Sequence, residues 1–290
     1  MLLVNCYLDK DGKHYQIDEN GVVTERTKLP TNITGGHFEA NDKGEWSYIT
    51  EQGEKLTGFQ YVDGVELYFD KDGKQLKGQE ITVDGKTYYL DQNTGALLKN
   101  SYRNWSEKQI IPRYKTNYIY HTSYFNRDGI RATGLVKTAA GFIHYFDENG
   151  ELLKNVAVNV GDTTYVFGEG GRLARKSFIW DKVDFTFPEN VNFYYGDEKG
   201  HAVKGLQTID GYQLYFDKNG RQAKDKIVQI DGKTYYFDKT NGRMVKNQWA
   251  SVNVGGISPA SKDYRSYYLG NDGAAMTGWQ DIDGERLYFT

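Results

Sequence analysis

The chain has 290 residues, with 36 basic and 39 acidic side chains and a formal net charge of −3. A charge this close to balance lacks the basic stripe that nucleic-acid binding requires, and a single cysteine excludes an internal disulfide. Only 38% of the residues are hydrophobic, whereas 33 are glycine and 24 are tyrosine, which indicates a thin core distributed along a repeated structure.

The first 57 residues are the least regular part of the sequence. Met1 to Val4 is too short an apolar stretch for a signal peptide, and no stretch of the chain is long enough to predict a membrane span. We expect residues 1–57 to hold divergent repeats and residues 58–290 to form one continuous array of regular repeats. Whether residues 1–40 belong to the same array is left open by the sequence.

A segment of about 20 residues recurs in the regular part of the chain. Units of the first kind open with Gly-x-Gln, at Gly58, Gly205 and Gly278. A degenerate relative begins at Gly134. A second kind of unit follows, as in Val83–Asp91 and Ile230–Asp238, and then a longer, irregular kind, as in Gln248–Thr277. The three kinds form triplets of about 73 residues, and the chain stops inside a repeat, which we interpret as a segment of a longer protein.

Each short unit is predicted to be a β-hairpin. Asp-Gly pairs favour two-residue hairpin turns because both turn positions need a positive φ. They occur at Asp63-Gly64, Asp84-Gly85, Asp210-Gly211, Asp231-Gly232 and Asp283-Gly284. The Leu-Tyr-Phe or Tyr-Tyr-Phe run after each pair has high strand propensity, and a second turn follows. Since an isolated hairpin is marginal in water, we predict an all-β fold, a β-solenoid of stacked hairpins.

The sequence contains no recognisable catalytic constellation. The five histidines are widely separated and share no metal-ligand spacing, and there is no Gly-x-Ser-x-Gly motif or phosphate-binding loop. Most acidic residues lie in predicted turns, and none forms an identifiable pair of the kind that glycosidases use. We therefore predict no catalytic residue, no metal site and no cofactor, and we expect that this chain is not itself an enzyme.

Polar side chains distinguish the Gly-x-Gln units from the other kinds. Before the turn these units carry Gln60, Gln207 and Gln280, and across the hairpin they carry Glu66, Gln213 and Arg286. The second kind has Ile81 or Val228 at the first of these positions, and the Gly134 unit has Val136. Paired amide and charged groups beside aromatic rings suit a sugar, whose hydroxyls they bind while rings cover its apolar face. A solvated strand face remains the alternative explanation.

Aromatic residues are the second candidate group. Tyr68, Tyr215 and Tyr288 follow the turn in the Gly-x-Gln units, and Tyr120, Trp249 and Tyr264 lie in the long units. We expect the long units to fold over a neighbouring Gly-x-Gln unit and supply a stacking wall for a sugar. The alternative is that the tyrosines pack one repeat on the next and that the long units form a bulkier part of the stack.

The repeat blocks resemble a known family. Gly-Leu-Gln-Thr-Ile-Asp-Gly-x-x-Leu-Tyr-Phe-Asp and Asp-Gly-Lys-Thr-Tyr-Tyr-Phe-Asp are similar to the glucan-binding repeats of streptococcal and lactic-acid-bacterial glucansucrases, glycoside hydrolase family 70, and of glucan-binding proteins. These belong to the wider group of cell-wall-binding repeats. The resemblance covers nearly the whole chain. It implies a secreted or cell-surface β-solenoid outside the catalytic core, which binds α-glucans such as dextran or mutan.

The same resemblance implies where the sugar would bind. Pockets would combine Gln60 with Glu66, Gln207 with Gln213, and Gln280 with Arg286, each with a stacking ring from the preceding long unit. Val136 departs from the pattern, so a pocket at the Gly134 unit is not expected. Several weak pockets on one array would bind a glucan polymer by avidity. A further implied partner is the catalytic domain of the parent protein.

Two alternatives remain open at this stage. The first is a wall-attachment module for choline or teichoic acid, since choline-binding repeats share the architecture. Their second box tryptophan is replaced here, by Glu66, Gln213 or Arg286 in the Gly-x-Gln units, and this dismantles the aromatic cage that quaternary ammonium groups require. The second alternative is a rigid spacer without a ligand.

Overall fold

The fold consists of β-strands joined by tight turns. The computed structural model describes residues 6–11, 13–17, 23–26, 31–109, 117–182, 191–253 and 263–290. Over those ranges it contains strands and no helix, so no helix there could span a membrane. This confirms the all-β prediction.

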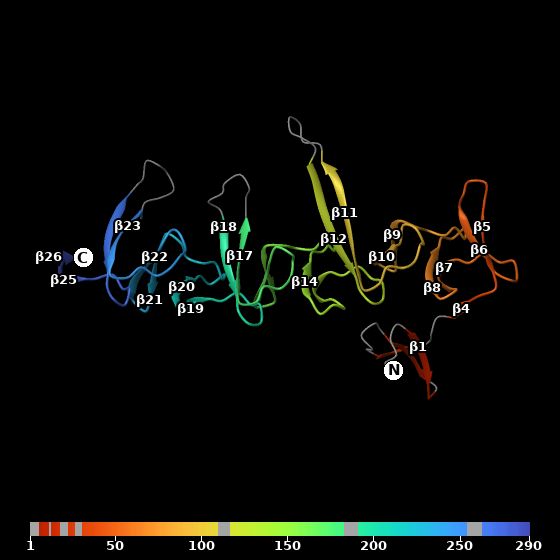
Figure 1. Cartoon of the computed structure of the whole chain (residues 1–290), viewed down its shortest axis with the longest axis horizontal. Helices are drawn as coiled ribbons and strands as arrows, with labels where there is room; N and C mark the ends of the chain where they lie inside the picture. The colour runs from red at the N-terminus through yellow and green to blue at the C-terminus, as the bar shows by residue number, and fades with distance from the viewer. Residues whose placement is uncertain are drawn as a thin grey trace. The chain divides into compact units, whose positions relative to one another are not determined.

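The chain divides into two compact units, Met1–Leu153 and Lys154–Thr290. The sequence analysis divided the chain after residue 57 on repeat regularity, whereas the contacts divide it after Leu153. In each unit nearly all strands pair antiparallel with their neighbour in sequence (Figure 1).

The first unit contains a small N-terminal sheet followed by hairpins. Its strands are β1 Cys6–Lys10, β2 Lys13–Ile17, β3 Val23–Arg26, β4 Asn32–Ile33, β5 His37–Ala40, β6 Trp46–Ile49, β7 Gly58–Val62, β8 Val65–Phe69, β9 Gln79–Val83, β10 Lys86–Leu90, β11 Ser101–Gln109, β12 Asn117–Phe125, β13 Gly134–Lys137 and β14 Ile143–Phe146. Strands β1, β2 and β3 form one sheet, and β4 pairs in parallel with β7.

The second unit contains hairpins only. Its strands are β15 Val156–Val160, β16 Thr163–Phe167, β17 Ser177–Lys182, β18 Val191–Gly196, β19 Gly205–Ile209, β20 Tyr212–Phe216, β21 Lys226–Ile230, β22 Lys233–Phe237, β23 Gln248–Asn253, β24 Tyr264–Leu269, β25 Gly278–Ile282 and β26 Glu285–Phe289. Each odd-numbered strand pairs antiparallel with the next even-numbered one.

The Asp-Gly pairs form the predicted turns. At Asp63-Gly64 the two φ angles are 49° and 84°, and at Asp210-Gly211 they are 51° and 80°. The other three pairs have the same two positive angles. Two left-handed residues in succession match a type I′ turn, whose twist fits the twist of the paired strands. The local sequence therefore fixes the register of these hairpins.

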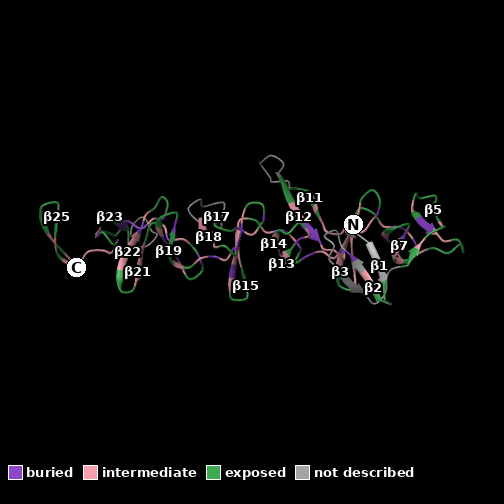
Figure 2. Cartoon of the chain, turned by 60° about the horizontal axis from the view of Figure 1, so that its bottom comes forward, coloured by how far each residue is buried: buried purple, intermediate pink, exposed green. Residues whose placement is uncertain are grey.

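A large apolar side chain at the end of most hairpins lies in the core. Phe69, Leu90, Phe125, Phe146, Phe167, Phe216, Phe237 and Leu269 are all fully buried. Each of these residues forms an antiparallel β-bridge with the segment that follows the second turn of its own unit, as Phe69 does with Gln75 and Phe216 with Gln222. Figure 2 shows buried residues within the strands and exposed residues at the turns. The thin core predicted from composition is thus a row of large side chains, accompanied by small clusters such as that of Val166, Ile179 and Tyr194.

The segment after the second turn of each unit, called its tail below, joins consecutive hairpins. The backbone N–H of Gln75 donates to Trp46 in the preceding hairpin over 2.7 Å, and the next N–H, of Leu76, donates to Tyr68 in its own hairpin over 3.0 Å. In the second unit Gln222 and Ala223 repeat this arrangement, with Phe193 and Tyr215 as acceptors. Because each linking segment bonds on both sides, the hairpins of each unit stack in sequence order, as a β-solenoid requires.

A left-handed residue opens each hairpin. Glycine fills this place at Gly58, Gly78, Gly134, Gly205 and Gly278, and asparagine or aspartate fills it at Asn100, Asn155, Asp225 and Asn247. Lys176 is the exception, with a φ of 47°. A lysine pays a steric cost in this region that glycine and asparagine largely avoid.

Candidate functional site

The predicted polar pairs do not share a hairpin face. Gln60 lies opposite Leu67, whereas Glu66 lies opposite Tyr61. The same offset separates Gln207 from Gln213 and Gln280 from Arg286. Directly opposed residues share a face and successive residues alternate, so an offset of one residue places the members on opposite faces. The expectation that each pair forms one pocket within a hairpin is therefore wrong, although each residue can still belong to a site.

The three glutamines share one structural role. The side-chain Nε2 of Gln60 donates to the backbone carbonyl of Thr57 over 2.6 Å. Gln207 and Gln280 make the same bond to Lys204 and Thr277, over 2.7 and 2.9 Å. Each bond spans the left-handed glycine that opens the hairpin. The glutamine thus stabilises the start of the first strand.

The tyrosines of the Gly-x-Gln units each contact another aromatic ring. The Tyr68 ring meets Phe59 at 4.9 Å in an edge-to-face arrangement, and Tyr288 meets Trp279 at 5.1 Å. Tyr215 instead contacts Phe237 of the following hairpin at 5.8 Å. Such ring pairs stabilise the stack beyond the area that they bury.

The long hairpins supply one of the three expected stacking rings. Trp249 on β23 contacts Tyr268 at 5.3 Å and reaches Phe289 of the following hairpin at 5.6 Å. Tyr120 and Tyr264 are exposed by 74% and 58% and make no ring contact within the described ranges. Of these three, only Trp249 touches a neighbouring Gly-x-Gln unit.

A cavity of about 540 Å³ lies beside the turn of the β19–β20 hairpin. Its lining includes Tyr212, Gln213, Arg243, Lys246 and Gln248. The Oε1 atom of Gln213 is buried and has no hydrogen-bond partner among the described residues. The Arg243 guanidinium lies over the Tyr212 ring, 3.2 Å from its centroid, and this cation–π contact fixes the direction of its N–H groups.

The cavity is lined by residues that are distant in sequence. The segment that links two hairpins brings them together. Met244 follows the second turn of the β21–β22 unit, and its N–H donates to the carbonyl of Gln213 over 2.8 Å. This bond brings Arg243 and Lys246 against the preceding hairpin. The site therefore combines the turn of one hairpin with the tail of the next, an arrangement that the sequence analysis did not identify.

The first triplet has the same backbone arrangement, but different side chains occupy this position. Leu97 N–H donates to the carbonyl of Glu66 over 2.8 Å, as Met244 does to Gln213. Here, however, the Glu66 carboxylate forms an ion pair with Lys99, the counterpart of Lys246. Ala96 replaces Arg243 at this point of the repeat. The side chain at this position is thus held in an ion pair within the chain, unlike that of Gln213.

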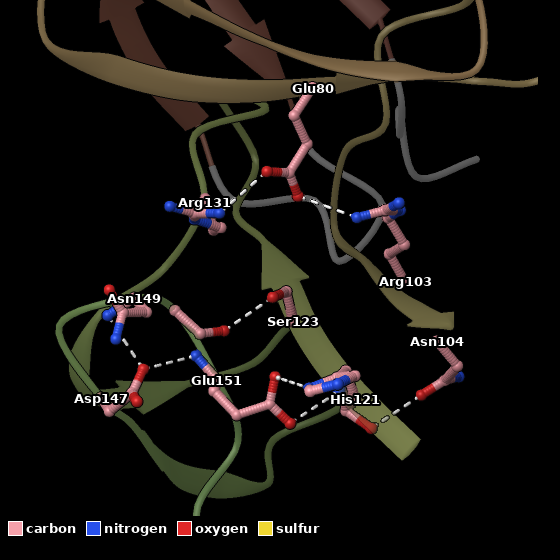
Figure 3. Close-up of polar contacts among 11 residues, drawn as sticks. Glu80, Arg103, Asn104, His121, Ser123, Arg131, Asp147, Asn149 and Glu151 are labelled. Atoms are coloured by element: carbon pink, nitrogen blue, oxygen red, sulfur yellow. Dashed lines mark hydrogen bonds and ion pairs between the residues drawn. The ribbon is translucent and has the colours of Figure 1, made fainter. Parts of the chain in front are cut away.

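A carboxylate bridge stabilises the neighbouring hairpins of the first unit. Glu80 on β9 accepts from Arg103 on β11 and from Arg131 in the following tail, each over 2.9 Å (Figure 3). All three side chains are about three-quarters buried. One carboxylate therefore holds together three consecutive parts of the stack.

Trp105 belongs to this packed region and offers no open platform. Its ring stacks on His121 at 5.1 Å with 17° between the planes, and the Arg103 guanidinium lies 4.5 Å from its centroid. His121 Nδ1 lies 3.2 Å from the Glu151 carboxylate (Figure 3). No group of three or more His, Cys, Asp or Glu side chains within the described ranges is placed to hold a metal ion.

Comparison with known proteins agrees with the repeat pattern. Residues 56–102 and 203–249 match the choline-binding repeat family. The chain is 33% identical to glucosyltransferase-S of Streptococcus mutans and 33% identical to glucosyltransferase-I of Streptococcus downei. These matches cover 90% and 93% of this chain but only 16% and 19% of the relatives, so the chain spans less than a fifth of their length.

A solved structure shows the same fold. The modular autolysin LytC from Streptococcus pneumoniae aligns with a TM-score of 0.51 and 18% identity, over 88% of this chain and 51% of that one. The similarity to the glucosyltransferases confirms the resemblance to glucansucrase repeats, and the structural match agrees with the predicted repeat fold. Two segments of the chain match the choline-binding repeat family, and over most of its length the chain is similar to a small part of the streptococcal glucosyltransferases.

Proposed function

We propose that this region binds an α-glucan of the dextran type and that the Gln213 cavity is its main site. The buried Oε1 of Gln213, which needs a hydrogen-bond donor, is the observation that supports the proposal most directly. A sugar hydroxyl in the cavity would supply that donor. The resemblance to glucan-binding repeats and the similarity to proteins named as glucosyltransferases point to glucose polymers.

The chemistry of the cavity suits a neutral sugar. Gln213 accepts a hydrogen bond, while Arg243 and Lys246 donate. The carboxylate of Asp238 is already used, because it accepts backbone N–H bonds from Thr240, Asn241 and Arg243 within its own turn. We propose that Arg243 and Lys246 donate to hydroxyl oxygens of the sugar.

Binding to a polymer would gain strength from further contacts. A single open cavity of this kind is expected to bind a short oligosaccharide in the millimolar range, about −4 kcal/mol. We propose that Gln60, Gln280, Arg286 and the exposed rings of Tyr120, Trp249 and Tyr264 supply additional weak contacts. Simultaneous contacts along one polymer would raise the apparent affinity by about 10²-fold or more.

Electrophoresis through gels that contain dextran tests the proposal. We expect Gln213→Ala to lose most of the retardation, because the variant removes the acceptor and leaves the rest of the cavity. Gln229→Ala is the matched control, since Gln229 is an exposed glutamine in the same triplet that bonds only to Thr234. Long dextran should compete far better than isomaltotriose per mole of sugar chain. Equal retardation of the wild type and Gln213→Ala, with unchanged melting, would place dextran binding outside this cavity. The absence of retardation in both proteins would instead support a spacer without a ligand.

The choline-attachment alternative is tested in the same gels. In the first triplet the Phe59 ring packs directly on Tyr88 at 4.8 Å, and Leu206 takes the place of Phe59 in the third triplet. Both features leave little room for an aromatic cage around a quaternary ammonium group. We therefore expect that choline and teichoic acid do not displace the chain from dextran. Elution by either would favour wall attachment.

We further propose an extracellular or cell-surface location and an association with a catalytic domain in the parent protein. Both rest on the resemblance to secreted glucansucrases and on the small share of each relative that the chain covers. Fractionation of a culture of the source organism, with an antibody against the chain, would test the first. The size of the detected band would test the second.

A further inference from the structure

A second cavity, of about 510 Å³, lies against the long hairpin β17–β18. Its lining includes Arg172 and Arg175 from the tail of the β15–β16 unit and Phe178 and Trp180 from β17. It contains no residue of a Gly-x-Gln unit. The glutamine pattern therefore does not account for it.

The charge of this cavity is positive. Arg172 and Arg175 contribute two guanidinium groups, and Glu169 is the one carboxylate in the lining. The adjacent Lys176 is paired with Glu198 over 2.6 Å. Arg175 is exposed and forms no ion pair within the described part of the chain. Guanidinium groups are the side chains best suited to bind carboxylate or phosphate in a bidentate manner.

The same cavity has an aromatic wall. Phe178 is held by an edge-to-face contact with Tyr195 at 4.8 Å. Trp180 lies two residues further along β17, on the same strand face, and is 46% exposed. An exposed indole ring next to a fixed phenyl ring offers the apolar surface on which a sugar ring stacks.

We propose that this cavity binds an anionic glycan, with the sugar ring on Trp180 and the acidic group on Arg172 and Arg175. The site differs from the Gln213 cavity, where Tyr212 is covered by Arg243 and the acceptor Gln213 needs a hydroxyl donor. The inference does not depend on dextran binding. The shared chemistry of the ligand is its negative group, either the carboxylate of a uronic acid or the phosphodiester of a polyol-phosphate polymer. Only the uronic acid also has a ring that can stack on Trp180.

Titration of the intact 290-residue chain with two probes tests the inference: an oligogalacturonate and a poly(glycerol phosphate). At low salt we expect at least one probe to bind. The double variant Arg172→Ala/Arg175→Ala should lose about tenfold or more in affinity, the effect of one charge-assisted hydrogen bond. Trp180→Ala should weaken the binding of oligogalacturonate, which has a ring to stack, and leave poly(glycerol phosphate) almost unaffected. The probe that binds more tightly identifies the source of the acidic group.

Arg265→Ala is the matched control, because it removes an exposed cation from β24, outside this cavity. Equal loss in the control and in an Arg172/Arg175 variant would show diffuse attraction and overturn the inference, as would the absence of binding by both probes. Dextran retardation of the arginine variants should stay unchanged. Conversely, Gln213→Ala should leave the anionic probes unaffected, so failure of one site is distinguishable from failure of the other.

Discussion

Gln213 and Glu66 occupy the same point of two triplets. Exchanging the amide and the carboxylate between them should change both dextran affinity and stability. Gln213 borders a cavity and keeps an unpartnered oxygen, whereas Glu66 at the same point of the first triplet is paired with Lys99. Because Lys246 corresponds to Lys99, Gln213→Glu should create the same ion pair in the third triplet. The substitution changes an amide to a carboxylate of nearly the same shape, so the fold should be retained.

The size of the effect follows from burial. The side chains of Glu66 and Lys99 are 24% and 26% exposed, which places their ion pair between surface pairs, worth about 0–1 kcal/mol, and fully buried ones. Glu66→Gln should therefore lower the free energy of unfolding by about 1 kcal/mol. Gln213→Glu should leave it unchanged or raise it by up to about 1 kcal/mol. Its dextran affinity should fall by about tenfold or more, because the new carboxylate occupies the donors that the sugar would use.

Urea unfolding and dextran gels measure both effects on the same samples. Gln229→Glu is the control, since it adds the same charge at an exposed position of the third triplet and should alter neither measurement. Retained dextran binding in Gln213→Glu would refute the assignment of the cavity. A loss of stability in that variant larger than about 1 kcal/mol would refute the comparison with the Glu66 ion pair.

Three further predictions concern stability. Glu80→Ala should cost about 2 kcal/mol in urea unfolding, because it leaves two partly buried arginines facing each other; a loss below about 0.5 kcal/mol would contradict the bridge. Burial and the hydrogen bond to Asp225 raise the pKa of Tyr236 to about 12, so stability should fall as the pH rises from about 10 to about 12, and less steeply in Tyr236→Phe. Lys176→Asn should raise the free energy of unfolding by about 0.5–1 kcal/mol by relieving the left-handed lysine, since the exposed pair with Glu198 contributes little; no gain by thermal melting would argue against strain there.

The hairpins could be predicted from sequence because their determinants are local. An Asp-Gly pair sets two positive φ angles by itself, and the Leu-Tyr-Phe run that follows places the buried Phe216 one residue after Tyr215. The all-β fold and the stacking therefore follow from short stretches of sequence. The pairing of Gln207 with Gln213 failed for an equally local reason: the two-residue turn places Leu214, one residue further on, opposite Gln207.

The candidate cavities could not be predicted in the same way. The Gln213 cavity needs Arg243 and Lys246, which reach it only because the tail of the following unit bonds to the preceding hairpin. No short motif encodes that contact. The periodic tyrosines were also weak evidence for a site, because Tyr68 and Tyr288 pack on rings of their own hairpin. A sequence rule that pairs each tail with the preceding hairpin would have predicted that Gln213 and Arg243 lie close together.

The backbone bond between a tail and the preceding hairpin also explains why the number of binding sites need not equal the number of repeats. Where a tail bonds to the preceding hairpin, as at Leu97 and Met244, its side chains lie beside that hairpin. The side chains at this point differ between triplets: Glu66 forms an ion pair with Lys99, whereas Gln213 and Arg243 line a cavity. The stack itself depends on the buried row that includes Phe69 and on backbone bonds, which none of these exchanges alters. Avidity for a glucan should therefore scale with the number of cavities and not with the length of the array.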